Sequence, residues 1–158
     1  MKISVSIIAL ILVFGSALLS QKPDSLLKMA EIEYEHKNFS KTRDLCEQAL
    51  LLNPNLGEAH NLIGKAYASS SEICGLEKES HRIKEEILWI AIDEWERAIS
   101  KPNSKSAEAK KLITRYSSYL PTGEHFRNCF TGSNLDEGDE FFVECWIQRM
   151  TTVRFKMQ

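Results

Sequence analysis

A pattern that repeats every 34 residues within residues 23 to 122 constrains the fold of this chain more than any other feature. Met29-Ala30 returns as Ile63-Gly64 after 34 residues, and Ile63 returns as Leu112 after 49. The second spacing is longer by 15 residues, so one insertion inside the second unit explains both. Repeats of this length are typical of stacked supersecondary units that bury their apolar faces against their neighbours. We therefore expect a single array.

The first 20 residues have the layout of a secretory signal peptide. Lys2 gives a basic start, residues 3 to 19 carry no charge, and Ala17 and Ser20 supply small residues near the end. We predict cleavage after Ser20, with cleavage after Ala17 as the second choice. The alternative is an uncleaved membrane anchor, because the uncharged run approaches the lower limit for spanning a bilayer. In both cases we expect the remainder to be exported, to the periplasm or the extracellular space.

Apolar residues at helical spacing predict two helical pairs and one further helix within residues 21–122. The expected helices cover residues 23–36, 39–52, 56–68, from about 76 or 80 to 100, and 105–120. The insertion is placed at about residues 70–84, with Cys74-Gly75 in a loop. Gly64 is predicted to lie where two helix backbones approach closely. Pro121-Thr122-Gly123 is expected to end the helical part.

The pattern changes in the C-terminal tail, residues 123–158. Phe141–Trp146 and Thr151–Phe155 are rich in aromatic and β-branched residues, which favour strands. We predict a small β-hairpin with its turn near Gln148-Arg149. Its aromatic residues should pack on the last helices, because a two-stranded sheet alone is marginal. The predicted fold class is mainly α: an array of α-hairpins, about two and a half repeats long, with a small C-terminal β-hairpin.

Charge and cysteine content restrict the function further. A net charge of −2 gives no electrostatic reason to expect nucleic acid or an anionic membrane surface as partner. The four cysteines allow three complete pairings, and the sequence does not decide among them. Cys46 lies on an apolar helix face and is expected to be a small buried side chain. Cys129 and Cys145 flank a turn region and are candidates for a disulfide.

No residue pattern typical of an enzyme or a metal site occurs in the sequence. Adjacent carboxylates such as Glu85-Glu86 point about 100° apart on a helix and make no acid–base couple. The four histidines lack the spacing of metal ligands, and the acidic turn at residues 136–140 lacks the alternation of a calcium loop. We therefore predict a protein that is not an enzyme and has no cofactor or metal. An uncharacterised hydrolase is a remote alternative.

Residues 23 to 122 resemble the tetratricopeptide repeat (TPR) family. The matching positions are Leu26, Met29, Ala30, Phe39, Ala49 and Pro54, then Ile63, Gly64, Tyr67, Trp95 and Ala98. His60 departs from the pattern, because the family often has Trp or another large apolar residue there. The chain is also similar to small exported bacterial TPR proteins with a C-terminal hairpin. The elements of that similarity are Tyr116, Tyr119 and Pro121, then Glu137-Gly138-Asp139, Phe141, Val143, Trp146-Ile147 and residues 151–154.

The resemblance implies a binding groove. In TPR proteins the first helices of successive units line a concave groove that holds a peptide. By register, the corresponding residues here are Leu27, Glu31, Tyr34, Glu35, Glu58, Asn61, Lys65, Lys110 and Thr114. Asn61 is a candidate backbone clamp, because an amide side chain both donates and accepts hydrogen bonds.

We therefore expect an exported adaptor of the cell envelope that binds a protein or peptide partner. It would bind no nucleic acid, and it would touch a membrane only through an uncleaved signal anchor. The alternative is a structural subunit that associates with itself through the hairpin or the ends of the array.

Overall fold

The computed structural model describes residues 22–78, 83–102, 106–129 and 135–156. The helices within these ranges are α2 (Pro23–Glu35), α3 (Phe39–Leu52), α4 (Gly57–Ser69), α5 (Ser71–Lys78), α6 (Ile83–Ser100), α7 (Ser106–Ser117) and α8 (Gly123–Cys129). Two strands follow, β1 (Glu140–Val143) and β2 (Arg149–Thr152).

The predicted fold class, mainly α with a small C-terminal β-hairpin, is confirmed. The predicted signal peptide lies outside the described residues. Among the helices that are described, none has both the length and the apolarity needed to cross a membrane.

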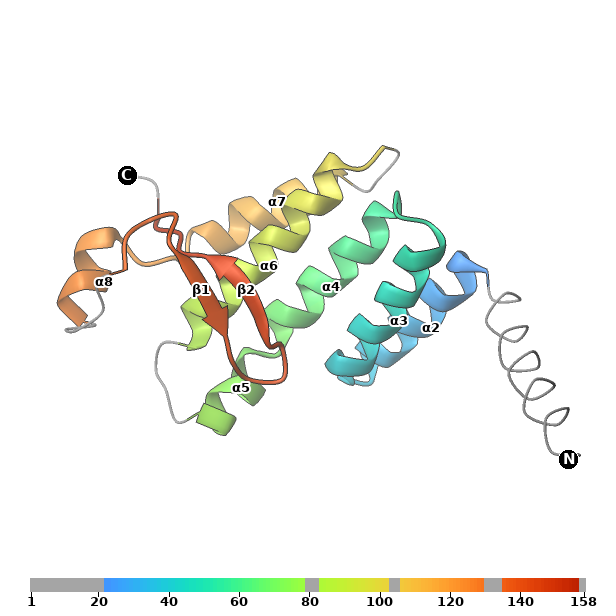
Figure 1. The fold of residues 1–158 in the computed structure, drawn as a ribbon, viewed down its shortest axis with the longest axis horizontal. Coiled ribbons are helices and arrows are strands. Elements are labelled where there is room, and N and C mark those ends of the chain that lie inside the picture. The colour runs from blue at the N-terminus through green and yellow to red at the C-terminus, as the bar shows by residue number, and fades with distance from the viewer. Residues whose placement is uncertain (1–21, 79–82, 103–105, 130–134, 157–158) are drawn as a thin grey trace, which may run out of the picture.

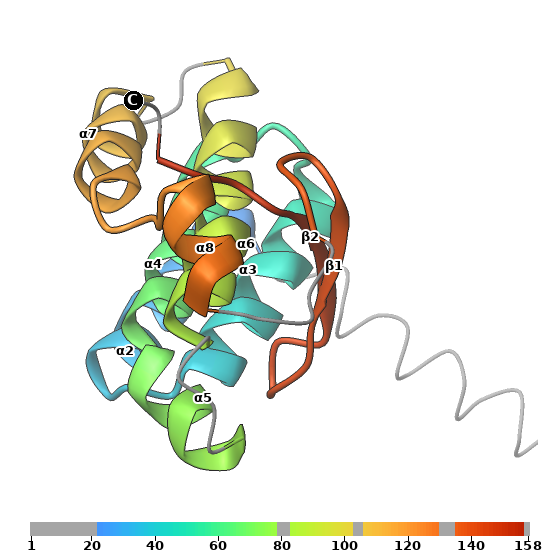
Figure 2. The same ribbon diagram turned by 90° about the vertical axis from the view of Figure 1, so that its left-hand side faces the viewer.

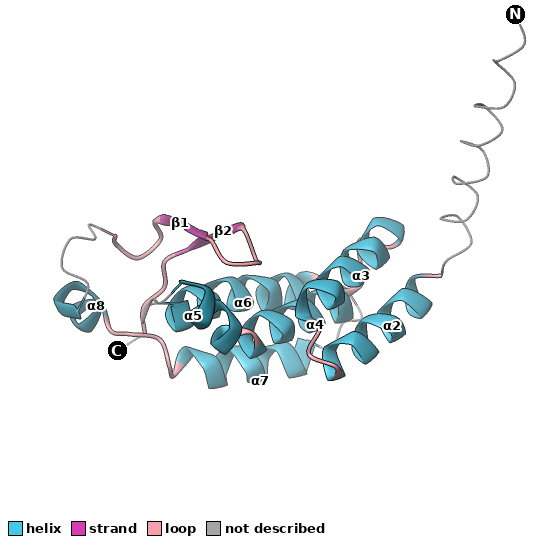
Figure 3. Ribbon diagram, turned by 90° about the horizontal axis from the view of Figure 1, so that it is seen from below, coloured by secondary structure: helices cyan, strands magenta, loops and turns pink. Residues whose placement is uncertain are grey.

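The long helices lie side by side in chain order. α2, α3, α4, α6 and α7 each pack against the next, as Figure 1 shows from the blue helix to the orange one. Figure 3 shows α3 and α6 on the side of the hairpin, and α2, α4 and α7 on the other side. Figure 2 shows the hairpin along one flank of the helices, with α8 near its open end. The helices therefore form two layers, and the hairpin covers one of them.

Local sequence signals set the ends of the first helical pair. Pro23 opens α2, where its missing N–H is not needed. α2 ends in a Schellman motif: Asn38 N donates to Glu33 O, Lys37 N donates to Tyr34 O, and Lys37 has a φ of 61°. α3 ends at Leu52, and its C-cap residue Asn53 is extended because the following residue is a proline. The predicted boundaries of this pair are accurate to within a residue.

The second pair, α4 and α6, packs closely at Gly64. A Cβ built on Gly64 of α4 would lie 2.5 Å from Nε1 of Trp95 and 3.0 Å from the carbonyl oxygen of Ala91, both on α6. Trp95 is fully buried, and its indole N–H donates to the carbonyl of Asn61 at 3.3 Å. The prediction that Gly64 permits a close backbone approach is confirmed.

Two short helices contradict the sequence analysis. The Cys74-Gly75 segment, predicted as a loop, lies inside α5, where Cys74 N donates to Ser70 O in continuous helical fashion. Pro121-Thr122-Gly123 does not end the helical part, because α8 follows. Thr122 caps α8 by accepting a hydrogen bond from the His125 N–H through its hydroxyl at 3.1 Å. Both helices depend on burial: Cys74 packs in the core, and Phe126 of α8 packs against Trp89 of α6.

The hairpin has a longer connection than predicted. Strand β1 pairs antiparallel with β2, with Val143 opposite Arg149, so residues 144–148 form the connection and the predicted turn near Gln148-Arg149 is wrong. Gln148 closes it with a φ of 46° and an N–H bond to Glu144 O at 3.1 Å. Cys145, Trp146 and Ile147 therefore leave the strand and contact the helices.

Candidate functional site

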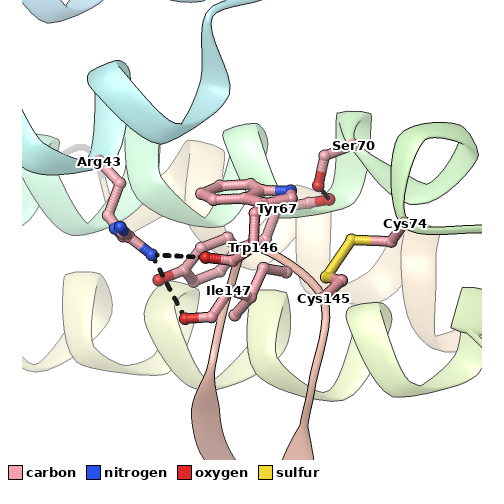
Figure 4. The surroundings of a disulfide bond; sticks show 7 residues. All are labelled: Arg43, Tyr67, Ser70, Cys74, Cys145, Trp146 and Ile147. Carbon is pink, nitrogen blue, oxygen red and sulfur yellow. Dashed lines mark hydrogen bonds between the residues drawn. A yellow bond between two sulfur atoms is a disulfide. The ribbon is translucent and has the colours of Figure 1, made fainter. Parts of the chain in front are cut away.

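A disulfide joins the hairpin connection to the inserted helix. Cys74 of α5 and Cys145 are bonded, with their Cα atoms 5.4 Å apart (Figure 4). The candidate pairing of Cys129 with Cys145 is therefore wrong, because Cys145 already has another partner. Cys46 is buried and free, as expected. Sequence spacing gave no signal for the bond, since the two cysteines are 71 residues apart and meet only through the helix packing.

Arg43 holds the same connection from the other side. Its guanidinium donates to the carbonyl oxygens of Trp146 and Ile147 at 3.2 and 3.3 Å and lies over the Trp146 ring at 5.2 Å (Figure 4). The Trp146 ring also packs against Tyr67 of α4, with ring centroids 5.6 Å apart. The connection is thus fixed to α3, α4 and α5 at once.

Ion pairs fix strand β2 and the residues after it. Arg149 pairs with Glu47 of α3, and Arg154 pairs with Asp93 and Glu96 of α6 at 2.5 and 2.9 Å. Thr151 adds a hydroxyl bond to Asp93 at 2.7 Å. The hairpin is therefore held on α3 and on α6, which the sequence analysis places in two different helical pairs.

The aromatic residues of the tail divide into two groups. Phe141 packs edge-on against Trp89 of α6, and the Trp89 indole N–H donates to the carbonyl of Arg154 at 2.8 Å. The prediction that the aromatic side chains of the tail pack on the helices is therefore confirmed for Phe141 and Trp146 and wrong for Phe142. Phe142 points to solvent instead, with 48% of its surface exposed, beside its cross-strand partner Met150 with 50%.

On the layer away from the hairpin, the predicted groove residues Asn61 and Lys65 meet one carboxylate. Asn61 Nδ2 donates to Glu108 of α7 at 3.0 Å, and Lys65 Nζ donates to the other carboxylate oxygen at 2.5 Å. Asn61 is only 3% exposed, and its Oδ1 has no hydrogen-bond partner within the described part of the chain. This cluster joins α4 to α7.

The remaining groove residues are placed less favourably. Leu27 is buried and cannot contact a ligand, and the Tyr34 hydroxyl is hydrogen-bonded to Ser69 of α4 at 3.0 Å. Glu31 and Glu35 are exposed on α2, and Glu58 is half-buried on α4.

Lys110 and Thr114 lie away from the cluster. Lys110 follows Glu108 by two residues, which places it about 200° further round the helix. Thr114 is close to it, since its hydroxyl donates to the Lys110 carbonyl at 3.0 Å. Sequence reasoning missed Glu108 because it assumed that equivalent repeat positions face each other. A carboxylate half a turn before Lys110, opposite Asn61 and Lys65, was the available signal.

His60, which departs from the TPR pattern, has a polar partner. Its Nδ1 is hydrogen-bonded to Glu94 of α6 at 2.8 Å, and Arg97 donates to the other oxygen of Glu94 at 2.5 Å. Glu94 is 2% exposed, so both contacts compensate for the burial of a carboxylate. A large apolar residue at position 60 would leave one side of Glu94 without its partner.

A pocket of about 580 Å³ lies at the N-terminal end of α3. Its lining residues are Lys37, Asn38, Phe39, Ser40, Lys41, Asp44, Ile73 and Trp146. They come from the loop after α2, the first turns of α3, helix α5 and the hairpin connection. Nothing in the sequence analysis brought these segments together.

Metal ligation and thiol chemistry can be judged from the described residues. No three His, Cys, Asp or Glu side chains in that part of the chain lie together as metal ligands. Burial raises the pKa of the Cys46 thiol to about 12, so the thiol is protonated near neutral pH and is a poor nucleophile.

Comparisons with protein-family models, curated proteins and solved structures found no match to this chain. The resemblance to the TPR family therefore stays a prediction that rests on the quoted residues. What the structure adds is a helical array with a polar cluster on one layer and a clamped hairpin on the other.

Proposed function

We propose that this chain is an exported, non-enzymatic interaction protein whose helical array binds a segment of another protein. The array belongs to the TPR family under this proposal, with α2, α4 and α7 lining the binding face. That face lies on the layer opposite the hairpin and is not covered by another element in the described residues (Figure 3).

The observation that carries the proposal is the Asn61–Lys65–Glu108 cluster. A buried amide with an unused acceptor is unfavourable unless something compensates for it. Glu108 already occupies the amide N–H and the Lys65 ammonium, as a carboxylate of a bound peptide would. A partner segment that displaces Glu108 would gain the lysine and both functions of the amide. Lys65 and Glu108 are partly exposed, so their ion pair is weak enough to exchange.

The disulfide supports the export part of the proposal. Disulfides form and persist in oxidising compartments such as the periplasm and the extracellular space. The Cys74–Cys145 bond agrees with the predicted signal peptide on this point.

Photo-crosslinking in native envelope extract tests the binding face. The mature, disulfide-bonded protein would carry a photo-reactive residue in place of Glu31, which is exposed on α2. We expect a defined crosslinked partner, and we expect the Asn61→Ala/Lys65→Glu variant to lose it. The charge-matched control is Lys110→Glu, because Lys110 lies away from Glu108. An adduct that survives in the double variant, or that is lost equally in the control, would refute the groove.

A second candidate function has one specific observation in its favour. Phe142 and Met150 form an exposed apolar pair on the outer face of the hairpin, and exposed apolar surface often marks an interface. A structural subunit could associate with itself there. Light scattering at several concentrations decides: a mass that stays monomeric, unchanged by Phe142→Ser, argues against self-association.

A further inference from the structure

The pocket beside the first turn of α3 is separate from the binding face proposed above. Its apolar walls are Phe39 of α3, Ile73 of α5 and Trp146 of the hairpin connection. Its volume, about 580 Å³, is in the range of pockets that hold a small ligand or a few side chains. Ile73 remains 41% exposed, although large apolar side chains are usually covered.

The disulfide positions two of these apolar walls. Ile73 directly precedes Cys74, and Trp146 directly follows Cys145, so the covalent bond sets the separation of the two apolar side chains. Trp146 is fixed further by Tyr67 behind it and by Arg43 over its ring (Figure 4). The pocket is therefore preformed, and binding would not need to order its walls.

The charged rim of the pocket is positive on balance. Lys37 and Lys41 line it, and Asp44, the acidic residue of the rim, is paired with Arg43 at 3.0 Å. Lys41 is paired with Glu33 at 2.5 Å, but Lys37 makes no ion pair within the described residues. The Asn38 side chain donates to Glu33 rather than capping α3, so the positive end of the helix dipole also faces this rim.

We propose that this pocket binds a segment of a partner polypeptide in which an aromatic side chain is followed by an acidic one. The aromatic ring lies between Ile73 and Trp146, and the carboxylate lies near Lys37 and the first turn of α3. The inference rests on the proposed interaction function but not on the groove formed by α2, α4 and α7. It adds a second contact point, on residues that the TPR resemblance does not include.

The test uses two isosteric probes, acetyl-Ala-Phe-Asp-Ala-amide and the same peptide with Asn in place of Asp. Amide chemical shifts of the disulfide-bonded protein are followed during titration. We expect the Asp peptide to shift the amides of Phe39, Ser40 and Lys41 and the indole N–H of Trp146. We expect the Asn peptide to bind about tenfold more weakly. It lacks the negative charge that would strengthen hydrogen bonds from Lys37 and from the backbone N–H groups in the first turn of α3. Equal binding of the two peptides would overturn the proposal.

Variants separate this pocket from the groove. Lys37→Glu is expected to weaken binding of the Asp peptide about fivefold or more, because it replaces charge attraction by repulsion. Ile73→Ala is expected to weaken binding about threefold, because it removes apolar contact with the aromatic ring. Lys111→Glu, an exposed lysine of α7, is the charge-matched control and should leave binding unchanged. Asn61→Ala/Lys65→Glu should also leave it unchanged, even if that variant loses its crosslinked partner. Shifts confined to residues outside the pocket, or none up to about 10 mM peptide, would refute the site.

Discussion

The substitution Gly64→Ala tests the helix crossing on which the array depends. The added methyl group would lie 2.5 and 2.8 Å from two indole atoms of Trp95, which is too close for any real contact. Trp95 cannot turn away, because it is fully buried. Overpacking of this kind costs about 1–3 kcal/mol. The loss of the bond from the Trp95 indole to the Asn61 carbonyl adds about 1 kcal/mol.

Helix propensity acts in the opposite direction, because alanine is better than glycine inside a helix by about 1 kcal/mol. The net result is a decrease in the free energy of unfolding of about 2–3 kcal/mol, at the upper end because two indole atoms are contacted. Urea denaturation followed by tryptophan fluorescence measures it. Thr114→Ala, at an exposed position of α7, is the propensity control; it should stabilise by about 0.5 kcal/mol at most, because it also removes the exposed hydroxyl bond to the Lys110 carbonyl.

A double-mutant cycle identifies the steric partner. In a Trp95→Leu background the same Gly64→Ala change should cost at least 1 kcal/mol less, since the indole is gone. If Gly64→Ala instead stabilises the protein, the gain in helix propensity exceeds the steric cost, and the two helices are not in close contact. Equal costs in the two backgrounds would show that the clash is not with Trp95.

Two further predictions concern the cysteines. The double variant Cys74→Ala/Cys145→Ala should lower the free energy of unfolding by about 4 kcal/mol, because the bond closes a loop of 71 residues; a loss below about 1 kcal/mol in urea denaturation would contradict this account. The pKa of Cys46 is raised from 9.0 to about 12 by burial, so the stability it contributes is complete below pH 9 and is lost as the pH rises towards 12. At pH 8 iodoacetamide should therefore modify Cys46 only in denaturant, and mass spectrometry of the peptide that contains it would reveal modification of the native protein.

The sequence predicted what regular periodicity encodes. The first helical pair has long amphipathic stripes and clear breaks at Lys37-Asn38 and Asn53-Pro54, and its predicted boundaries are accurate. The predicted start of the fourth helix, at about residue 76 or 80, is wrong, because α6 begins at Ile83 and residues 76–78 belong to α5. Gly64 was placed correctly because a glycine amid an apolar helix pattern has few other roles. The hairpin was recognised from its composition, since aromatic and β-branched residues gather there without the spacing of an amphipathic helix.

The rest depends on tertiary contacts that a local pattern does not contain. α5 and α8 are 8 and 7 residues long, too short for a stripe to establish itself. The register of the hairpin is set by Cys145, Trp146 and Ile147, which leave the strand to contact helices far away in sequence. The disulfide and the pocket follow from that docking.

Two of the three residues in the polar cluster, Asn61 and Lys65, were among the predicted groove residues, and Glu108 was not. Asn61 and Lys65 were singled out through the TPR resemblance, and the structure brings them together. Lys110 was assigned by repeat equivalence, but contact between stacked helices also depends on how far one has shifted along the other. Glu108 therefore occupies the place that equivalence gave to Lys110.

The clamped hairpin has a mechanical consequence for the proposed binding face on the opposite layer. Arrays of stacked helical pairs bend and twist easily, because each pair touches only its neighbours. Here Arg43 ties the hairpin connection to α3, and the packing of Phe141 on Trp89 ties strand β1 to α6. Bending between the two helical pairs would require these contacts to separate. Under the proposed function, the array would therefore offer a partner polypeptide a curvature that is fixed before binding, and binding would need little change in backbone shape.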